Sequence, residues 1–186
     1  MSAPDHPRQL PLPLPATPSA ARADLVEDSS NAEALAWLDR PWDWPLHRLA
    51  LFGPAGTGKS HMLRATAATH GWRLLDGRAL TPGLALAPAS GTALDGADSA
   101  PEVALFHLIN RSAEQAAPLL LAAREPLARW PVALPDLASR LKATLAVGIG
   151  APSDALLAAQ LGKLLADRQL RVAPEVQDFL LARLPR

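Results

Sequence analysis

Lys59 and Ser60 have the most specific chemical meaning in this sequence, because they end the pattern G-x-x-x-x-G-K-[ST] that begins at Gly53. The lysine places a cation where it can reach the β- and γ-phosphates of a nucleotide, and the serine hydroxyl can bind Mg²⁺. Glycines in such a loop let backbone amides turn inward around a phosphate. The pattern therefore predicts a phosphate-binding loop.

Such a loop must follow a strand and precede a helix, and the sequence indicates both. Residues 49–52 are apolar and predict a strand, and residues 61–70 predict a helix whose positive end faces the same phosphate. This strand–loop–helix order makes a chance glycine-rich turn an improbable explanation. We assign the nucleotide contacts to Gly53, Pro54, Gly56, Thr57, Gly58, Lys59, Ser60 and His61.

A carboxylate that could hold Mg²⁺ together with Ser60 is Asp95, at the end of a predicted strand over residues 92–95. The next residue is Gly96, where many P-loop ATPases keep a second carboxylate that polarises the attacking water. We therefore expect weak ATP hydrolysis, or none, in this protein's own site. Asp98 lies further along and is expected to be a solvated turn residue.

The remaining segments predict an α/β fold. Further strands are expected at residues 72–76, 118–123 and 143–149, helices at 101–115 and 134–141, and an irregular segment at 77–91. Two more helices are predicted to begin near residues 152 and 172, the second with Val176, Phe179 and Leu180 facing inward. We expect a five-stranded parallel sheet with flanking helices over residues 23–150, and a partial helical lid over 151–186.

Composition narrows the functional classes. The 186 residues carry no net formal charge, so no overall positive field attracts nucleic acid or an anionic membrane. The absence of cysteine excludes disulfides and thiolate metal sites, and no apolar run approaches the length of a membrane span. We expect a cytoplasmic protein with no membrane association and no sequence-specific DNA binding.

The first 22 residues predict a disordered tail, because six prolines disfavour helix and sheet pairing there. Within this tail, leucines alternate with prolines behind one glutamine, and the extended backbone would present them with little ordering cost on binding. A docking peptide and a tail without a partner both fit this pattern. The residues of the candidate docking peptide are Gln9, Leu10, Leu12, Pro13 and Leu14.

Arg140 lies near the end of the helix predicted over residues 134–141. One interpretation is a surface arginine that favours a helix C-terminus. The other is an arginine supplied to a phosphate at a subunit boundary. The residue alone leaves both interpretations open.

Three pieces taken together, residues 9–14, 53–63 and 134–141 (LPDLASRL), resemble the Hda/HdaA family of bacterial AAA+ proteins related to the replication initiator DnaA. The resemblance spans nearly the whole chain, and it implies a negative regulator of replication initiation. Residues 9–14 would bind the sliding clamp of the replicative polymerase, and Arg140 would be an arginine finger acting on DnaA. The protein would thereby stimulate hydrolysis of DnaA-bound ATP.

The resemblance also implies ADP or ATP with Mg²⁺ as ligands, and it places Asn31 in the segment that lines the adenine pocket. A homodimer is left open. The chain departs from the family pattern at Gly96, and at Arg124-Glu125, where relatives often carry Asp-Arg. It ends at Arg186, about where relatives continue into further lid helices and a sensor-2 arginine, so we expect an incomplete lid.

Two alternatives compete with the regulator. A small P-loop kinase is permitted by size and charge, but residues 77–91 show no convergent polar cluster for a substrate, and Arg78 is their one arginine. A DnaA-like initiation or helicase-loading factor would require a basic stripe for DNA, and the sequence shows none. Phosphoryl transfer to a metabolite would favour the kinase, and salt-dependent DNA binding would favour the initiation factor.

Overall fold

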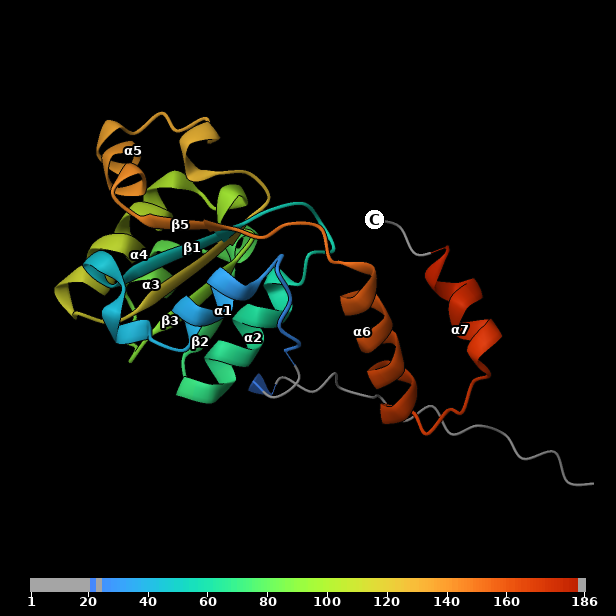
Figure 1. Ribbon diagram of the computed structural model, residues 1–186. Helices are drawn as coiled ribbons and strands as arrows, with labels where there is room; N and C mark the ends of the chain where they lie inside the picture. Colours follow the sequence, from blue (N-terminus) through green and yellow to red (C-terminus); the bar gives the residue numbers. More distant parts are fainter. Residues whose placement is uncertain (1–20, 23–24, 184–186) are drawn as a thin grey trace, which may run out of the picture.

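The phosphate loop lies at one edge of the sheet, after a strand that neighbours the outermost strand β5 (Figure 1). The computed structural model describes residues 21–22 and 25–183, and over these residues the chain forms one sheet of five parallel strands in the order β2-β3-β4-β1-β5. The strands are β1 (Arg48–Phe52), β2 (Arg73–Asp76), β3 (Thr92–Asp95), β4 (Leu119–Ala123) and β5 (Leu145–Gly148). Because the strands are parallel, their carboxyl ends share one edge, where open α/β sheets bind ligands.

Helices cover both faces of the sheet, so that the body has three layers (Figure 1). The alternation of side chains along β1 shows this division: Leu49 and Leu51 pack with α1 and α2, while Ala50 packs with α3, α4 and α5. Leu49, Ala50 and Leu51 are all at most 1% exposed, as expected for a central parallel strand. The helices of the body are α1 (Ala32–Leu38), α2 (Lys59–His70), α3 (Pro82–Leu86), α4 (Glu102–Glu114) and α5 (Pro135–Lys142).

The five predicted strands are confirmed, but the prediction of an irregular segment at residues 77–91 is wrong in part. This segment contains a 3₁₀ turn, η4 (Gly77–Ala79), and the helix α3. Thr81 starts α3, because its side chain accepts a hydrogen bond from the amide of Leu84 and Pro82 occupies the first turn. Five helical residues are too few to show a periodic pattern in the sequence.

Two helices follow the sheet, α6 (Asp154–Asp167) and α7 (Pro174–Leu181), and they stand beside the three-layered body (Figure 1). The prediction that Val176, Phe179 and Leu180 face inward is wrong, since they are 47%, 54% and 38% exposed. The two helices pack on each other, and none of the described helices or strands forms a further layer over them. None of the described helices is both long and apolar enough to cross a lipid bilayer.

The carboxyl ends of β2 and β3 are held together by close backbone contact at Gly77. A β-carbon added to Gly77 would overlap the carbonyl oxygen of Gly96 and approach that of Asp95 to 3.2 Å. We expect Gly77→Ala to lower the free energy of unfolding by about 2–3 kcal/mol, because backbone atoms cannot yield as a flexible side chain would. The measurement is urea denaturation followed by circular dichroism.

Gly83→Ala is the matched control, because Gly83 lies in α3 and a β-carbon there would meet no atom within 4 Å. This variant should be neutral or more stable by up to about 1 kcal/mol, since alanine favours a helix. Equal stability of the two variants would contradict the packing described for Gly77.

Candidate nucleotide-binding site

The phosphate loop connects β1 to α2 at the carboxyl edge of the sheet. Gly58, at the N-cap of α2, has a left-handed backbone with φ of 89°, and Gly56 has φ of 85°. These are the conformations that the glycine pattern predicts. α2 begins at Lys59, so its N-terminal amides face the same space as the loop.

The ammonium group of Lys59 is held inside the loop. Its Nζ donates hydrogen bonds to the carbonyl oxygens of Gly53 and Pro54, at 2.7 and 2.6 Å, and contacts the Thr57 hydroxyl at 3.2 Å. Burial lowers the pKa of Lys59, an effect that the nearby carboxylate of Asp95 opposes. The lysine therefore sits as a cation at the centre of the loop, where a phosphate group would compete for its donors.

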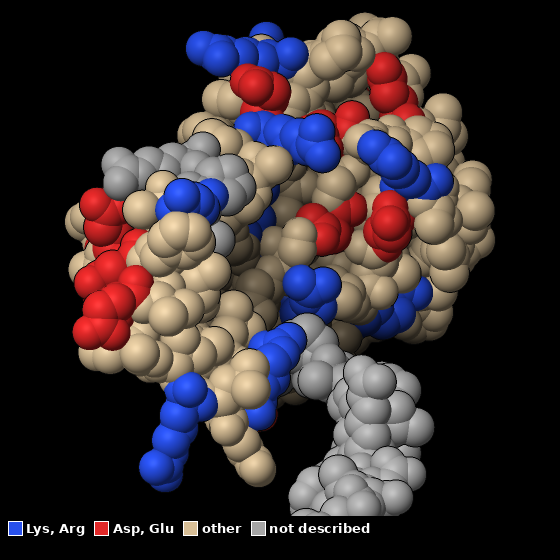
Figure 2. All heavy atoms as spheres, turned by 90° about the vertical axis from the view of Figure 1, so that its right-hand side faces the viewer, with Lys and Arg blue, Asp and Glu red and all other residues tan. Residues whose placement is uncertain are grey.

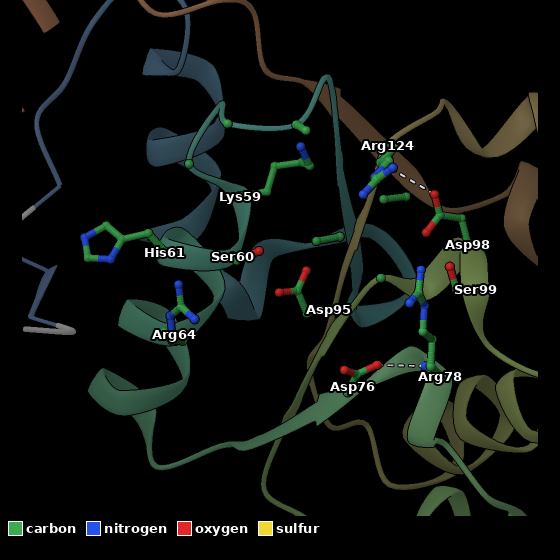
Figure 3. Close-up of a pocket in the computed structure, with 16 residues that line it drawn as sticks. Lys59, Ser60, His61, Arg64, Asp76, Arg78, Asp95, Asp98, Ser99 and Arg124 are labelled. Atoms are coloured by element: carbon green, nitrogen blue, oxygen red, sulfur yellow. Dashed lines mark hydrogen bonds between the residues drawn. The ribbon is translucent and has the colours of Figure 1, made fainter. Parts of the chain in front are cut away.

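A cavity of about 790 Å³ opens in front of the loop, which is a suitable size for a nucleotide (Figure 3). Six of the predicted site residues line it: Gly56, Gly58, Lys59, Ser60, His61 and Asp95. Gly53, Pro54 and Thr57 do not line it, but their oxygen atoms accept hydrogen bonds from Lys59. The structure thus brings the predicted phosphate and Mg²⁺ residues together around one space.

Ser60 and Asp95 face each other across the inner part of this cavity, from the first turn of α2 and the end of β3 (Figure 3). Both present the oxygen donors that Mg²⁺ prefers, and Mg²⁺ in such sites completes its shell with phosphate oxygens and water. The two residues therefore fit the ion. Their role as Mg²⁺ ligands remains a prediction.

Asp98 is an exposed turn residue, as predicted, and it also lines the cavity. Gly96 has a left-handed backbone with φ of 64° and caps the 3₁₀ turn η5 (Ala97–Ser99), which turns Asp98 toward the end of β4. There the Asp98 carboxylate accepts a hydrogen bond from the backbone amide of Arg124 at 3.1 Å (Figure 3). Asp98 thus links the ends of two strands at the cavity wall.

Two further arginines line the cavity, although no motif assigned them to it. Arg64 comes from α2 and Arg78 from η4, and together with Arg124 they surround the cavity on three sides (Figure 3). The carboxylates that line the same cavity belong to Asp76, Asp95 and Asp98. With Lys59 included, cations outnumber carboxylates by four to three, which suits a polyphosphate bound with a metal ion.

Asn31 is buried, and its side chain is engaged within its own segment. The Asn31 amide oxygen accepts a hydrogen bond from the amide of Asp28 at 2.9 Å, and its nitrogen donates to the Val26 carbonyl at 3.0 Å. Asp28 in turn accepts hydrogen bonds from Ser30 and from Ser153 before α6, which lower the pKa of its carboxyl to about 2. Asn31 therefore orders residues 26–31, which precede α1, and Asp28 joins these residues to Ser153 at the start of α6. Contact of Asn31 with adenine remains a prediction.

Arg140 is not among the residues that line the cavity. It lies on α5, and its Nε donates to the amide oxygen of Asn110 on α4 at 2.6 Å. The guanidinium carbon also lies 4.7 Å from the ring centre of Phe106. Arg140 is thus held in one orientation at a place separate from this protein's own nucleotide cavity. The candidate clamp-binding residues Gln9, Leu10, Leu12, Pro13 and Leu14 lie outside the described residues.

The parallel sheet, the phosphate loop after its inner strand β1 and the two helices that follow the sheet define a P-loop NTPase fold of the AAA+ type, which confirms the predicted fold class. Structural comparison places this fold near DnaA. The chain is similar to AMPPCP-bound DnaA from Aquifex aeolicus, with 17% identity over 90% of this chain and 61% of that one, and a TM-score of 0.71.

Two other solved structures are also similar to this chain. Domain III of DnaA from Thermotoga maritima shares 16% identity over 90% of this chain and 82% of that one, with a TM-score of 0.73. A crystal structure of a DNA replication initiation factor shares 17% identity over 89% of this chain, with a TM-score of 0.73. The chain spans 60% of the length of that factor. No family model matches the sequence, and no curated protein is significantly similar to it.

Proposed function

We propose that this protein is a negative regulator of replication initiation of the Hda/HdaA type. Its tail, residues 9–14, binds the sliding clamp, and Arg140 acts in trans on ATP bound to DnaA. The observation that carries the proposal is the place of Arg140, which is held by Asn110 and Phe106 away from the protein's own nucleotide cavity. An arginine fixed outside its own site is available to the nucleotide of another protein.

Within this proposal, the protein's own cavity holds ADP or ATP with Mg²⁺ mainly as a structural ligand. The likeness to AMPPCP-bound DnaA supports an adenine nucleotide. Gly96 follows Asp95 in place of a carboxylate, and the nearby Asp98 is engaged by the amide of Arg124. Neither residue is arranged to polarise an attacking water in cis, so little ATP hydrolysis is expected from this protein alone.

The AAA+ fold favours the regulator over a small metabolite kinase, because such a kinase needs a mobile lid closing over a second substrate. The charge distribution argues against a DNA-remodelling factor. Figure 2 shows basic and acidic side chains interspersed on the face it displays, without a continuous basic stripe. A surface of this kind does not provide the row of phosphate contacts on which DNA affinity depends.

The direct experiment reconstitutes ATP-bound DnaA, a clamp loaded on DNA and this protein, and measures hydrolysis of the DnaA-bound ATP. We expect stimulation that requires both the protein and the loaded clamp. Equal stimulation without the clamp would show that clamp binding by the tail is not needed for the reaction. Salt-dependent DNA binding by this protein alone, or phosphoryl transfer to a metabolite in a substrate screen, would favour the alternative functions.

The tail has its own test. We expect Gln9→Ala combined with Leu12→Ala to weaken clamp binding by at least about tenfold, because anchors of a short docking peptide carry most of its binding energy. The measurement is co-elution with the clamp in size-exclusion chromatography, followed by titration calorimetry. Thr17→Ala combined with Ser19→Ala, in the same tail, should bind normally. Equal binding by both double variants would show that residues 9–14 do not form the docking peptide.

A further inference from the structure

One side of α4 holds α5 near both of its ends. Glu102, Phe106 and Asn110 are spaced four residues apart, so they follow one another along the same side of α4. The Glu102 carboxylate accepts hydrogen bonds from the backbone amides of residues 133–134, where α5 is about to begin, the shortest at 2.9 Å. Phe106 and Asn110 contact Arg140, near the end of α5. The position of Arg140 is therefore set by α4.

The groups that hold the Arg140 guanidinium are all uncharged. Its Nε donates to the amide oxygen of Asn110 at 2.6 Å, and its Nη1 donates to the backbone carbonyl of Asp136 at 3.3 Å. Its central carbon lies 4.7 Å from the centre of the Phe106 ring. No carboxylate forms an ion pair with Arg140 among residues 21–22 and 25–183. The side chain is thus oriented, but its positive charge is not compensated.

Other arginines of this chain are held by carboxylates. Arg22 donates two hydrogen bonds to the Asp39 carboxylate, at 2.7 and 2.8 Å, and Arg129 donates one to the Glu125 carboxylate at 3.3 Å. A carboxylate would attach Arg140 at least as firmly, because hydrogen bonds between two charged groups are the strong ones. The neutral amide oxygen beside Arg140 instead leaves the charge available to an incoming anion.

We propose that Asn110 is a positioning residue, which holds Arg140 through Nε without neutralising it. The terminal nitrogens then meet the phosphates of a nucleotide bound to another protein. Nη2 makes no hydrogen bond with any residue that the structure describes, and Nη1 makes only the long one to Asp136. The contact with phosphate is therefore end-on, through these two nitrogens. The inference rests on the proposed function and deepens it, by naming the residue that orients the arginine finger.

Two substitutions of Asn110 separate orientation from charge. Asn110→Leu removes the acceptor oxygen and should lower the maximal rate of hydrolysis of DnaA-bound ATP by at least about tenfold. Asn110→Asp keeps an acceptor oxygen but compensates the charge of Arg140, and it should also lower this rate by about tenfold. The concentration of protein that gives half-maximal stimulation should change little, because Asn110 acts through Arg140. Gln115→Ala, which removes an exposed amide at the end of the same helix, should stimulate normally.

Hydrogen exchange of the Arg140 Nε–H group, followed by NMR on the isolated chain, reports orientation without DnaA or the clamp. Exchange should be slow in the unchanged protein and in Asn110→Asp, and faster by at least about tenfold in Asn110→Leu. Equally fast exchange in the unchanged protein and in Asn110→Leu would contradict the anchor. Slow exchange together with full stimulation by Asn110→Asp would show that the charge need not stay uncompensated, and would overturn the inference.

Arg140→Ala distinguishes failure of the inference from failure of the proposed function. If Arg140→Ala lost stimulation while both Asn110 variants stimulated fully, only the inference would fail. If Arg140→Ala itself stimulated normally, the proposed function would fail, and with it the role assigned to Asn110.

Discussion

Replacing Arg140 by alanine is expected to reduce stimulation of DnaA's ATP hydrolysis by about 10³–10⁵-fold, the contribution of an arginine finger supplied in trans. The Arg140 side chain does not line this protein's own nucleotide cavity, so the variant should bind nucleotide as the unchanged protein does. Clamp binding should also be unchanged, because residues 9–14 are distant in sequence from α5. The measurement is single-turnover hydrolysis of DnaA-bound ATP with the loaded clamp present.

Two variants make this result specific. Arg140→Lys keeps the charge but loses the planar fork that binds phosphate in two places, and it should recover only a small part of the stimulation. Arg129→Ala removes an exposed arginine whose side chain is 74% accessible, and it should stimulate normally. Normal stimulation by Arg140→Ala would exclude Arg140 as the residue that acts on DnaA.

The second large effect is expected at Lys59. Lys59→Ala removes the ammonium group at the centre of the phosphate loop, so affinity for ADP and ATP should fall by about 10- to 100-fold, the value of a charge-assisted hydrogen bond. Thermal unfolding with added ADP measures this directly. At a ligand concentration of 100 times the dissociation constant, binding stabilises the native state by about 2.7 kcal/mol. The variant should lose about half of that gain for a tenfold drop in affinity and most of it for a hundredfold drop.

Lys142→Ala is the control, because Lys142 lies at the end of α5 and does not line the cavity. It should respond to ADP as the unchanged protein does. If ADP stabilised Lys59→Ala as much as the unchanged protein, the nucleotide would have to bind outside the phosphate loop. Lys59→Ala also tests whether the protein needs its own nucleotide to act. If this variant lost ADP binding but still stimulated DnaA, the bound nucleotide would be dispensable for that activity.

Residues close together in the chain determined the phosphate loop. Gly56 and Gly58 adopt a left-handed backbone, which glycine tolerates, and the helix that was predicted over residues 61–70 begins two residues earlier, at Lys59. The strand ending at Asp95 has the same bounds in the sequence prediction and in the structure. Backbone preferences act within a few residues, so such local features can be read directly from the sequence.

Tertiary structure decided which distant side chains meet. Arg64 and Arg78 reach the nucleotide cavity, Asp98 is turned to the amide of Arg124, and Arg140 is held by α4. These meetings depend on the strand order β2-β3-β4-β1-β5 and on which helices cover each face, neither of which is encoded by any single segment.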